Sequence, residues 1–261
     1  MFGSRLRWRR AGGVRAIAMN TEIRDWVSYW DSSHSIYVNA RHADVHYRDI
    51  ASAIIGLIPH RDARVLDYGC GEAVHADAVA GQSRELVLCE AAPKLRARLT
   101  QRFAHVPNIS VLAPEDLKAL PAACFDLIVA NSVVQYVSRA ELESLLALWR
   151  RLLDPEGHVV IADVIPPEVG VLSDLAALLR YALANGFFFA ALVGVARTAT
   201  SSYRSLRAGL GIAQYSEAEF LALLAAAGYA AERLPRNMEH NQTRMTFIAK
   251  PADARANASA K

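Results

Sequence analysis

The chain has 261 residues, which is enough for one α/β domain with a full buried core and too few for two independent domains. Five of its 29 basic residues lie before Met19 with no acidic residue among them, which leaves 24 basic against 26 acidic residues in the rest of the chain. A nucleic-acid-binding surface would need a basic stripe on the folded part, so this balance argues against nucleic acid as a partner.

The arginine-rich leader, residues 1–19, has no apolar segment after Arg9 and Arg10 and so lacks the pattern of a secretory signal. We expect a disordered arm, or an upstream extension whose true start is Met19. An organellar transit peptide is a less favoured alternative, supported by the presence of arginine without acidic residues.

Residues 20–60 are expected to form a helical cap in front of the sheet. Trp26 and Trp30 share one helical face, and a second helix follows until Pro59 ends it.

From Arg64 onward, apolar strands alternate with helices, which indicates a parallel sheet with right-handed crossovers. The strands are predicted near 64–67, 86–90, 109–112, 125–130 and 158–164. Ligands of such sheets bind beyond the carboxyl ends of the strands. The polar residues at or just past those ends are Asp67, Glu90, Asp116, Asn131 and Asp163.

The turn from Asp67 to Glu72 joins the first strand to a helix. Gly69 and Gly71 let the backbone lie close against a ligand, and the helix N-terminus directs free N–H groups at it. A dinucleotide-binding turn would need glycine at position 74, where this chain has Val74.

Further motifs follow this turn in series: Glu90 after an apolar run, Glu115-Asp116, the segment 125–131, and the segment 152–163. Their order and spacing over positions 60–165 resemble the class I S-adenosylmethionine-dependent methyltransferases. Two departures are Ala73, where a third glycine is common, and Pro155-Glu-Gly157, where Pro-Gly-Gly is common.

The resemblance implies a methyltransferase domain over residues 20–250. The expected fold is α/β: a doubly wound, Rossmann-like sheet of seven strands, mostly parallel with an antiparallel last strand. An N-terminal helical lid precedes the sheet, and a helical insertion follows the fifth strand. Residues 251–261 are expected to be a disordered tail.

The resemblance also implies S-adenosylmethionine as cofactor. Asp67 and the glycine backbone would hold its methionyl part, and Glu90 would accept from both ribose hydroxyls. Asp116 would bind the adenine amino group, with a helix cap as its alternative role. The expected cofactor-binding residues are Asp67, Gly69, Cys70, Gly71, Glu90, Ala91, Glu115, Asp116, Leu117, Asn131 and Ser132.

The insertion, residues 168–215, contains an apolar run at 181–196. As a helix this run would span about 24 Å, short of the roughly 30 Å of a bilayer core. We favour three interpretations over a membrane span: a buried pair of lid helices, an apolar wall for a hydrophobic acceptor, or packing on the core. The run is also a candidate for peripheral membrane contact.

The C-terminal part begins with a capping box at Ser216 and Glu219, which predicts a helix ending near Gly228. Two final strands are predicted at 229–234 and 245–250. In the family's topology the loop between them lies at the cofactor edge, which makes Glu239, His240 and Asn241 acceptor-site candidates. A solvent-exposed polar loop is the rival interpretation.

Methyl transfer from a sulfonium needs no metal, because the leaving group is already activated. The catalytic candidates are His240, His34 and Tyr136, and in the cap Tyr37 and Arg41 are also candidates for ligand contact. The expected acceptor is a small molecule, apolar or lipid-like, and the methylated atom (O, N or C) stays open. A non-catalytic S-adenosylmethionine-binding partner protein is the alternative function, followed by a dinucleotide-dependent oxidoreductase.

The three cysteines, Cys70, Cys89 and Cys124, lack metal-site spacing and are typical of buried thiols in a reducing compartment. His75 and His158 stand apart from other ligand types. We therefore expect a cytoplasmic protein without a metal site.

Overall fold

The computed structural model describes residues 26–31, 37–198 and 211–252. The predicted disordered leader and most of the predicted tail lie outside the described residues, and so does His34.

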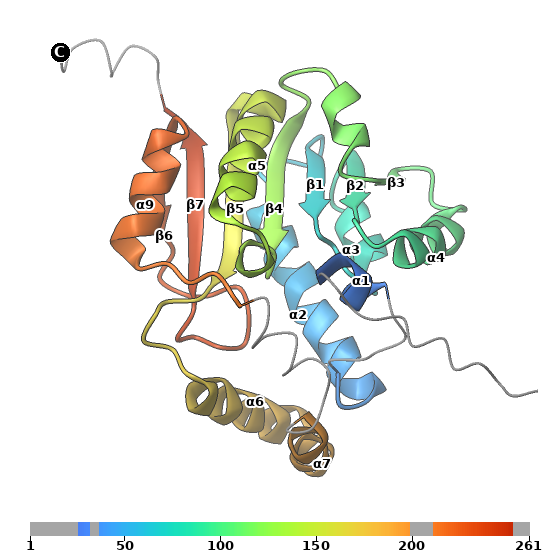
Figure 1. The fold of residues 1–261 in the computed structure, drawn as a ribbon. Helices are drawn as coiled ribbons and strands as arrows, with labels where there is room; N and C mark the ends of the chain where they lie inside the picture. The colour runs from blue at the N-terminus through green and yellow to red at the C-terminus, as the bar shows by residue number, and fades with distance from the viewer. Residues whose placement is uncertain (1–25, 32–36, 199–210, 253–261) are drawn as a thin grey trace, which may run out of the picture.

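A seven-stranded sheet with the order β3-β2-β1-β4-β5-β7-β6 forms the centre of the fold (Figure 1). Its strands are β1 (Arg64–Tyr68), β2 (Glu85–Cys89), β3 (Ile109–Leu112), β4 (Phe125–Asn131), β5 (Leu153–Val164), β6 (Tyr229–Arg233) and β7 (Met245–Pro251). β7 pairs antiparallel with both of its neighbours, whereas the β1–β5 pairs are parallel. This arrangement confirms the predicted fold class.

Helices cover both faces of the sheet, because each central strand directs alternate apolar side chains to opposite sides. Val65 and Leu127 belong to the core beneath the helices α2 (Ala40–Leu57), α3 (Ala76–Ala80) and α4 (Pro93–Phe103). Leu66 and Ile128 belong to the opposite core, beneath α5 (Arg139–Leu152) and α9 (Glu217–Ala226). All four side chains are fully buried.

β5 begins five residues earlier than the sequence predicts. Phe125 of β4 pairs with Leu153, and Leu127 pairs with His158, so the intervening residues bulge out between the two pairs. A Cβ at Gly157 would lie 2.8 Å from the carbonyl oxygen of Asp126 in β4. Because glycine has no Cβ, this polar stretch can lie close against β4 despite the bulge.

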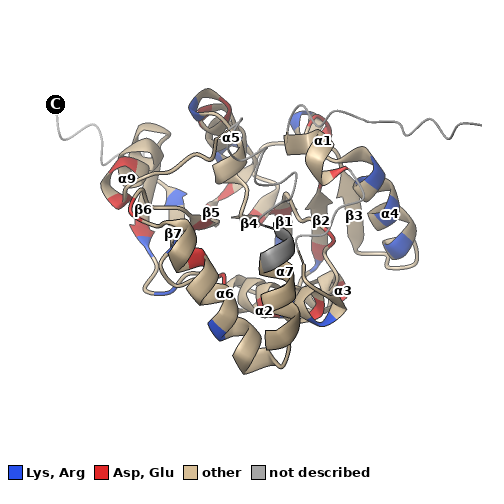
Figure 2. Ribbon diagram, turned by 60° about the horizontal axis from the view of Figure 1, so that its bottom comes forward, with Lys and Arg blue, Asp and Glu red and all other residues tan. Residues whose placement is uncertain are grey.

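The insertion after β5 forms two helices, α6 (Val171–Asn185) and α7 (Phe188–Thr198), joined at Gly186 in a left-handed conformation (φ 75°). Both helices lie beyond the carboxyl edge of the sheet, next to α2 (Figure 1). Their outer face carries few charges (Figure 2). It exposes the apolar residues Val171, Leu172, Leu183, Phe189, Leu192 and Val193. In the described part of the chain, every helix is too short or too polar to cross a bilayer.

The described structure also contains three short elements. They are α1 (Trp26–Trp30), η1 (Asp116–Ala119) and η2 (Val134–Tyr136).

α5 begins with a capping box in which Ser138 and Glu141 each accept from the other's backbone N–H. We predict that Ser138→Ala lowers the free energy of unfolding by about 0.5–2 kcal/mol, because a donor of the first turn loses its partner. Urea denaturation measures the change. The matched control is Ser144→Ala, which removes only a bond from the hydroxyl to Ala140 within the same helix. Equal loss in both variants would contradict the capping account.

Candidate active site

The turn after β1 is packed too tightly for side chains at its glycines. Gly69 and Gly71 have φ values of 72° and 59°, which side chains disfavour. A Cβ at Gly69 would lie 2.5 Å from Val133, and one at Gly71 would lie 2.7 Å from the Tyr47 hydroxyl. Only glycine therefore fits at these two positions without strain, and both residues line the cavity described below.

Glu90, directly after β2, is 7% exposed and holds this turn in place. Its Oε2 accepts from the backbone N–H of Gly71 at 3.1 Å, and its Oε1 accepts from that of Ala92 at 2.8 Å. Burial raises the pKa of Glu90 above its ordinary value, and the backbone donors oppose that rise. Each carboxylate oxygen still has a lone pair for a ligand hydroxyl.

Asp67 adds a second carboxyl group beside Glu90. Burial, with a further contribution from the charge of Glu90, raises the pKa of Asp67 to about 7. A cationic ligand placed between the two would favour the ionised form of both.

A cavity of about 390 Å³ lies at the carboxyl edge of the sheet, a volume suited to a small-molecule ligand. The predicted cofactor-binding residues that line it are Asp67, Gly69, Cys70, Gly71, Glu90, Ala91, Asn131 and Ser132. The catalytic candidates Tyr136 and His240 line it too, as do Glu239 and Asn241 of the β6–β7 loop.

Among the described residues, the cavity lining does not include Glu115, Asp116 or Leu117. Their neighbour Pro114 does line the cavity. The Asp116 carboxylate accepts from the backbone N–H of Ala113 at 2.9 Å, ahead of η1, and no side chain in the described part of the chain caps that helix. Leu117 is fully buried in the core. Asp116 is therefore not the cap of η1, and its expected contact with adenine stays a prediction.

Aromatic side chains close one side of the cavity. Tyr136 packs against Trp26 and Trp30 of α1, with ring centroids 4.5 Å and 5.8 Å away. The same three residues line the cavity. Tyr136 thus connects the cap to the end of β4.

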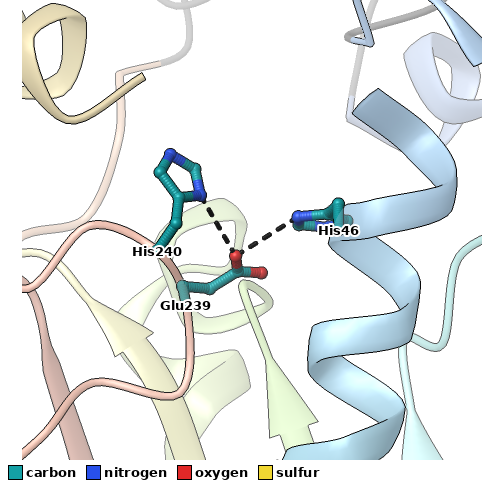
Figure 3. Close-up of side chains that lie close together, drawn as sticks. All are labelled: His46, Glu239 and His240. Carbon is teal, nitrogen blue, oxygen red and sulfur yellow. Dashed lines mark ion pairs between the residues drawn. The ribbon is translucent and has the colours of Figure 1, made fainter. Parts of the chain in front are cut away.

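A polar cluster of His46, Glu239 and His240 lies on another side of the cavity (Figure 3). The Nδ1 atoms of His46 and His240 lie 3.3 Å and 3.6 Å from the same carboxylate oxygen, Oε2 of Glu239. Asn131 donates to the other oxygen at 2.8 Å. Burial acts to raise the pKa of Glu239, but the two imidazoles and Asn131 hold it below the ordinary value.

The cap is fixed to both parts of the cavity. Tyr47 accepts from the backbone N–H of Glu72, at 2.9 Å, beside the glycine turn. One residue earlier in the same helix, His46 contacts Glu239. Tyr37 lines the cavity, whereas the Arg41 guanidinium instead donates to a backbone oxygen at the end of α6.

α6 covers His240 from outside. The Tyr181 ring stacks on the His240 ring with centroids 4.6 Å apart and planes at 21°, and its hydroxyl donates to Asp49 of α2 at 2.7 Å. Next to it, His42 is buried and stacks on Phe187, and burial lowers the pKa of His42 to about 4. His42 is therefore neutral and serves packing.

The β6–β7 loop is held by charge pairs. Arg244 contacts Asp163 at the end of β5 at 2.6 Å and Asp174 of α6 at 2.9 Å. Ser132 donates to the same Asp163 carboxylate at 2.7 Å. These contacts explain how a loop far along the chain is placed beside β4 and α2.

Sequence reasoning missed His46. The available signal was its position one helical turn after His42 and next to Tyr47, in a helix expected to cap the site. Its partner Glu239 lies 193 positions later, so nothing local marked the pair.

Comparison with known proteins identifies a family over the central part of the chain. Residues 66–161 match the model of a family described as a methyltransferase domain. A comparison with curated protein sequences finds no match.

Two solved structures illustrate the likeness in fold. The first is a 1,6-didemethyltoxoflavin-N1-methyltransferase from Burkholderia thailandensis with bound 1,6-didemethyltoxoflavin and S-adenosylhomocysteine. It is 18% identical over 83% of this chain and 84% of that chain, with a TM-score of 0.52. The second is a magnesium protoporphyrin IX methyltransferase from Synechocystis with bound S-adenosylhomocysteine. It is 14% identical over 85% of this chain and 90% of that chain, with a TM-score of 0.51.

We predict that Gly69→Ala lowers the free energy of unfolding by about 1–3 kcal/mol, because it places a Cβ against Val133 at a positive φ. Gly56→Ala is the control: Gly56 is a helical, exposed position with nothing within 4 Å of a Cβ. That variant should gain about 0.5–1 kcal/mol. Denaturant titration compares the two variants. An unchanged free energy of unfolding in Gly69→Ala would show that the turn can accommodate a Cβ.

Proposed function

We propose that this chain, whose residues 66–161 match the model of a methyltransferase domain, transfers a methyl group from S-adenosylmethionine to a small, apolar acceptor bound beneath α6. The carrying observation is that one cavity joins the glycine turn and Glu90 to the cluster of His46, Glu239 and His240. One end fits the cofactor and the other end fits the acceptor.

The cofactor end fits S-adenosylmethionine by its shape and its donors and acceptors. The backbone of Gly69 and Gly71 lines the cavity, where a ligand can lie close against it. Glu90 offers two fixed acceptor oxygens, which suits the two neighbouring hydroxyls of a ribose. Asp67 supplies negative charge near the place where the methionyl group would lie.

Catalysis would rest mainly on orientation. The cofactor supplies a methyl group already activated by the positive sulfur. The chain would align the acceptor with that methyl group, and alignment alone can lower a barrier by roughly 7–11 kcal/mol. The rings of Trp26, Trp30 and Tyr136 cover the cavity and would exclude water.

The acceptor end combines aromatic walls with a few polar groups, a pattern typical of small-molecule sites. Tyr37, His46 and His240 line it, and Tyr181 backs His240. The two solved relatives act on ring-shaped small molecules according to their names, which supports an acceptor of that kind. His240 is our candidate for contact with the reacting atom, and Tyr136 for the wall.

Several expectations continue as proposals: a domain over residues 20–250, a cytoplasmic location, and peripheral membrane contact through 181–196. The exposed Leu183 and Phe189 support the last of these.

An experiment distinguishes an enzyme from the alternative, a partner protein that binds the cofactor without turnover. Incubation with S-adenosylmethionine and a panel of phenolic, heteroaromatic and lipid acceptors should give S-adenosylhomocysteine, and binding without product on any acceptor would favour the partner protein.

We predict that Glu90→Ala weakens S-adenosylmethionine binding by roughly ten- to a few hundredfold, because charged hydrogen bonds contribute about 1.5–3 kcal/mol each. Calorimetric titration measures the affinity. Glu85→Ala is the control, since Glu85 lies at the other end of the same strand and pairs with Arg64. An unchanged affinity in Glu90→Ala would remove the ribose assignment.

We predict that affinity for S-adenosylmethionine rises with pH through about 7, the raised pKa of Asp67. The carboxylate form, which attracts the cationic cofactor, exists above that pKa. Below it, binding must expel a proton from Asp67, so the dissociation constant rises up to about tenfold per pH unit. In Asp67→Asn this pH dependence of the affinity should vanish. The same pH dependence in both proteins would assign it to another group.

A further inference from the structure

In the cluster of His46, Glu239 and His240, the protein alone does not provide good hydrogen bonds for the imidazole nitrogens. Charge-assisted hydrogen bonds are about 2.7–2.9 Å long, whereas these two imidazole nitrogens lie 3.3 Å and 3.6 Å from the carboxylate. Within the described residues, Nδ1 of His240 is buried without a hydrogen-bond partner. Leaving a buried polar atom unpaired costs about 1–3 kcal/mol.

The same three residues form a candidate metal site. The candidate ligand atoms of all three residues lie within 4.8 Å of one another. Zinc bonds to nitrogen and oxygen are about 2.0–2.2 Å long. In tetrahedral or octahedral shells, neighbouring ligand atoms are then about 2.8–3.6 Å apart. The two nitrogen–oxygen distances fall in that range, and both nitrogens face the same carboxylate oxygen of Glu239 (Figure 3).

We propose that Nδ1 of His46, Oε2 of Glu239 and Nδ1 of His240 bind a divalent metal ion of the zinc type. Two histidines and one carboxylate leave at least one coordination position open. The three residues line the cavity, so that position faces the proposed acceptor.

The surrounding residues support the ligands as outer-shell partners do in metal sites. Asn131 donates to Oε1 of Glu239, which leaves Oε2 for the metal. Tyr181 stacks on His240 and fixes its ring plane. Oδ1 of Asn131 is buried and without a hydrogen-bond partner in the described part of the chain, so it can accept from a metal-bound water.

The site would give the acceptor a chemical class, a step that rests on the proposed function. A hydroxyl group of the acceptor would pass its proton to a hydroxide held at the open position, which leaves as water and is replaced there by the acceptor oxygen. A lone pair of the resulting alkoxide or phenolate oxygen then forms the new O–CH₃ bond. The electron pair of the broken C–S bond stays on sulfur and gives S-adenosylhomocysteine.

The test uses the full chain, freed of metal with a chelator and titrated with Co²⁺, whose visible d–d absorption reports nitrogen and oxygen ligands. We expect saturable absorption at one ion per chain that Zn²⁺ abolishes by displacement. The variants His46→Ala, His240→Ala and Glu239→Gln should each lose it. His60→Ala is the control, because His60 forms an exposed histidine–carboxylate pair with Asp126 away from the cavity.

Calorimetric binding of S-adenosylmethionine to the metal-free proteins is measured in parallel and reports whether each variant is folded. Absence of saturable Co²⁺ absorption in the unaltered chain would overturn the metal site, as would absorption that persists in His46→Ala and His240→Ala. Metal binding without S-adenosylmethionine binding would instead overturn the proposed function and leave the metal site standing.

Discussion

The close approach of the Gly69–Gly71 backbone to its neighbours is the constraint on which the rest of the site depends. Val133 from the end of β4, Tyr47 from α2 and Glu90 from the end of β2 all contact this one turn. Three parts of the chain are therefore fixed relative to one another by this turn. Its backbone lines the cavity, where a ligand can lie close against it.

The second half of the cavity depends on contacts between residues far apart in sequence. Arg244 ties the β6–β7 loop to β5 and α6 through Asp163 and Asp174, and this places Glu239 beside α2. The cap then contributes Tyr47 to the end with the glycine turn and His46 to the end with Glu239, from adjacent positions. A shift of α2 would thus alter both ends of the cavity together, which under the proposed function would link cofactor binding to the shape of the acceptor site.

The sequence predicted what depends on local pattern. Strand and helix alternation gave the sheet, and the rule that ligands bind at carboxyl ends placed Asp67, Glu90 and Asn131 at the cavity. Asp116 lies outside the cavity lining, because its carboxylate accepts from the backbone of its own loop, which no spacing rule excludes. His46 was missed because its role arises from a contact with a distant loop.

The central claim is that one cavity holds S-adenosylmethionine with its methyl group directed at the cluster of His46, Glu239 and His240. A crystal structure of the chain with bound S-adenosylhomocysteine tests it most directly. The account predicts that the ribose hydroxyls contact Glu90 and that the sulfur faces Asn131, on the side of that cluster. A nucleoside bound elsewhere, or a sulfur directed away from the cluster, would contradict it.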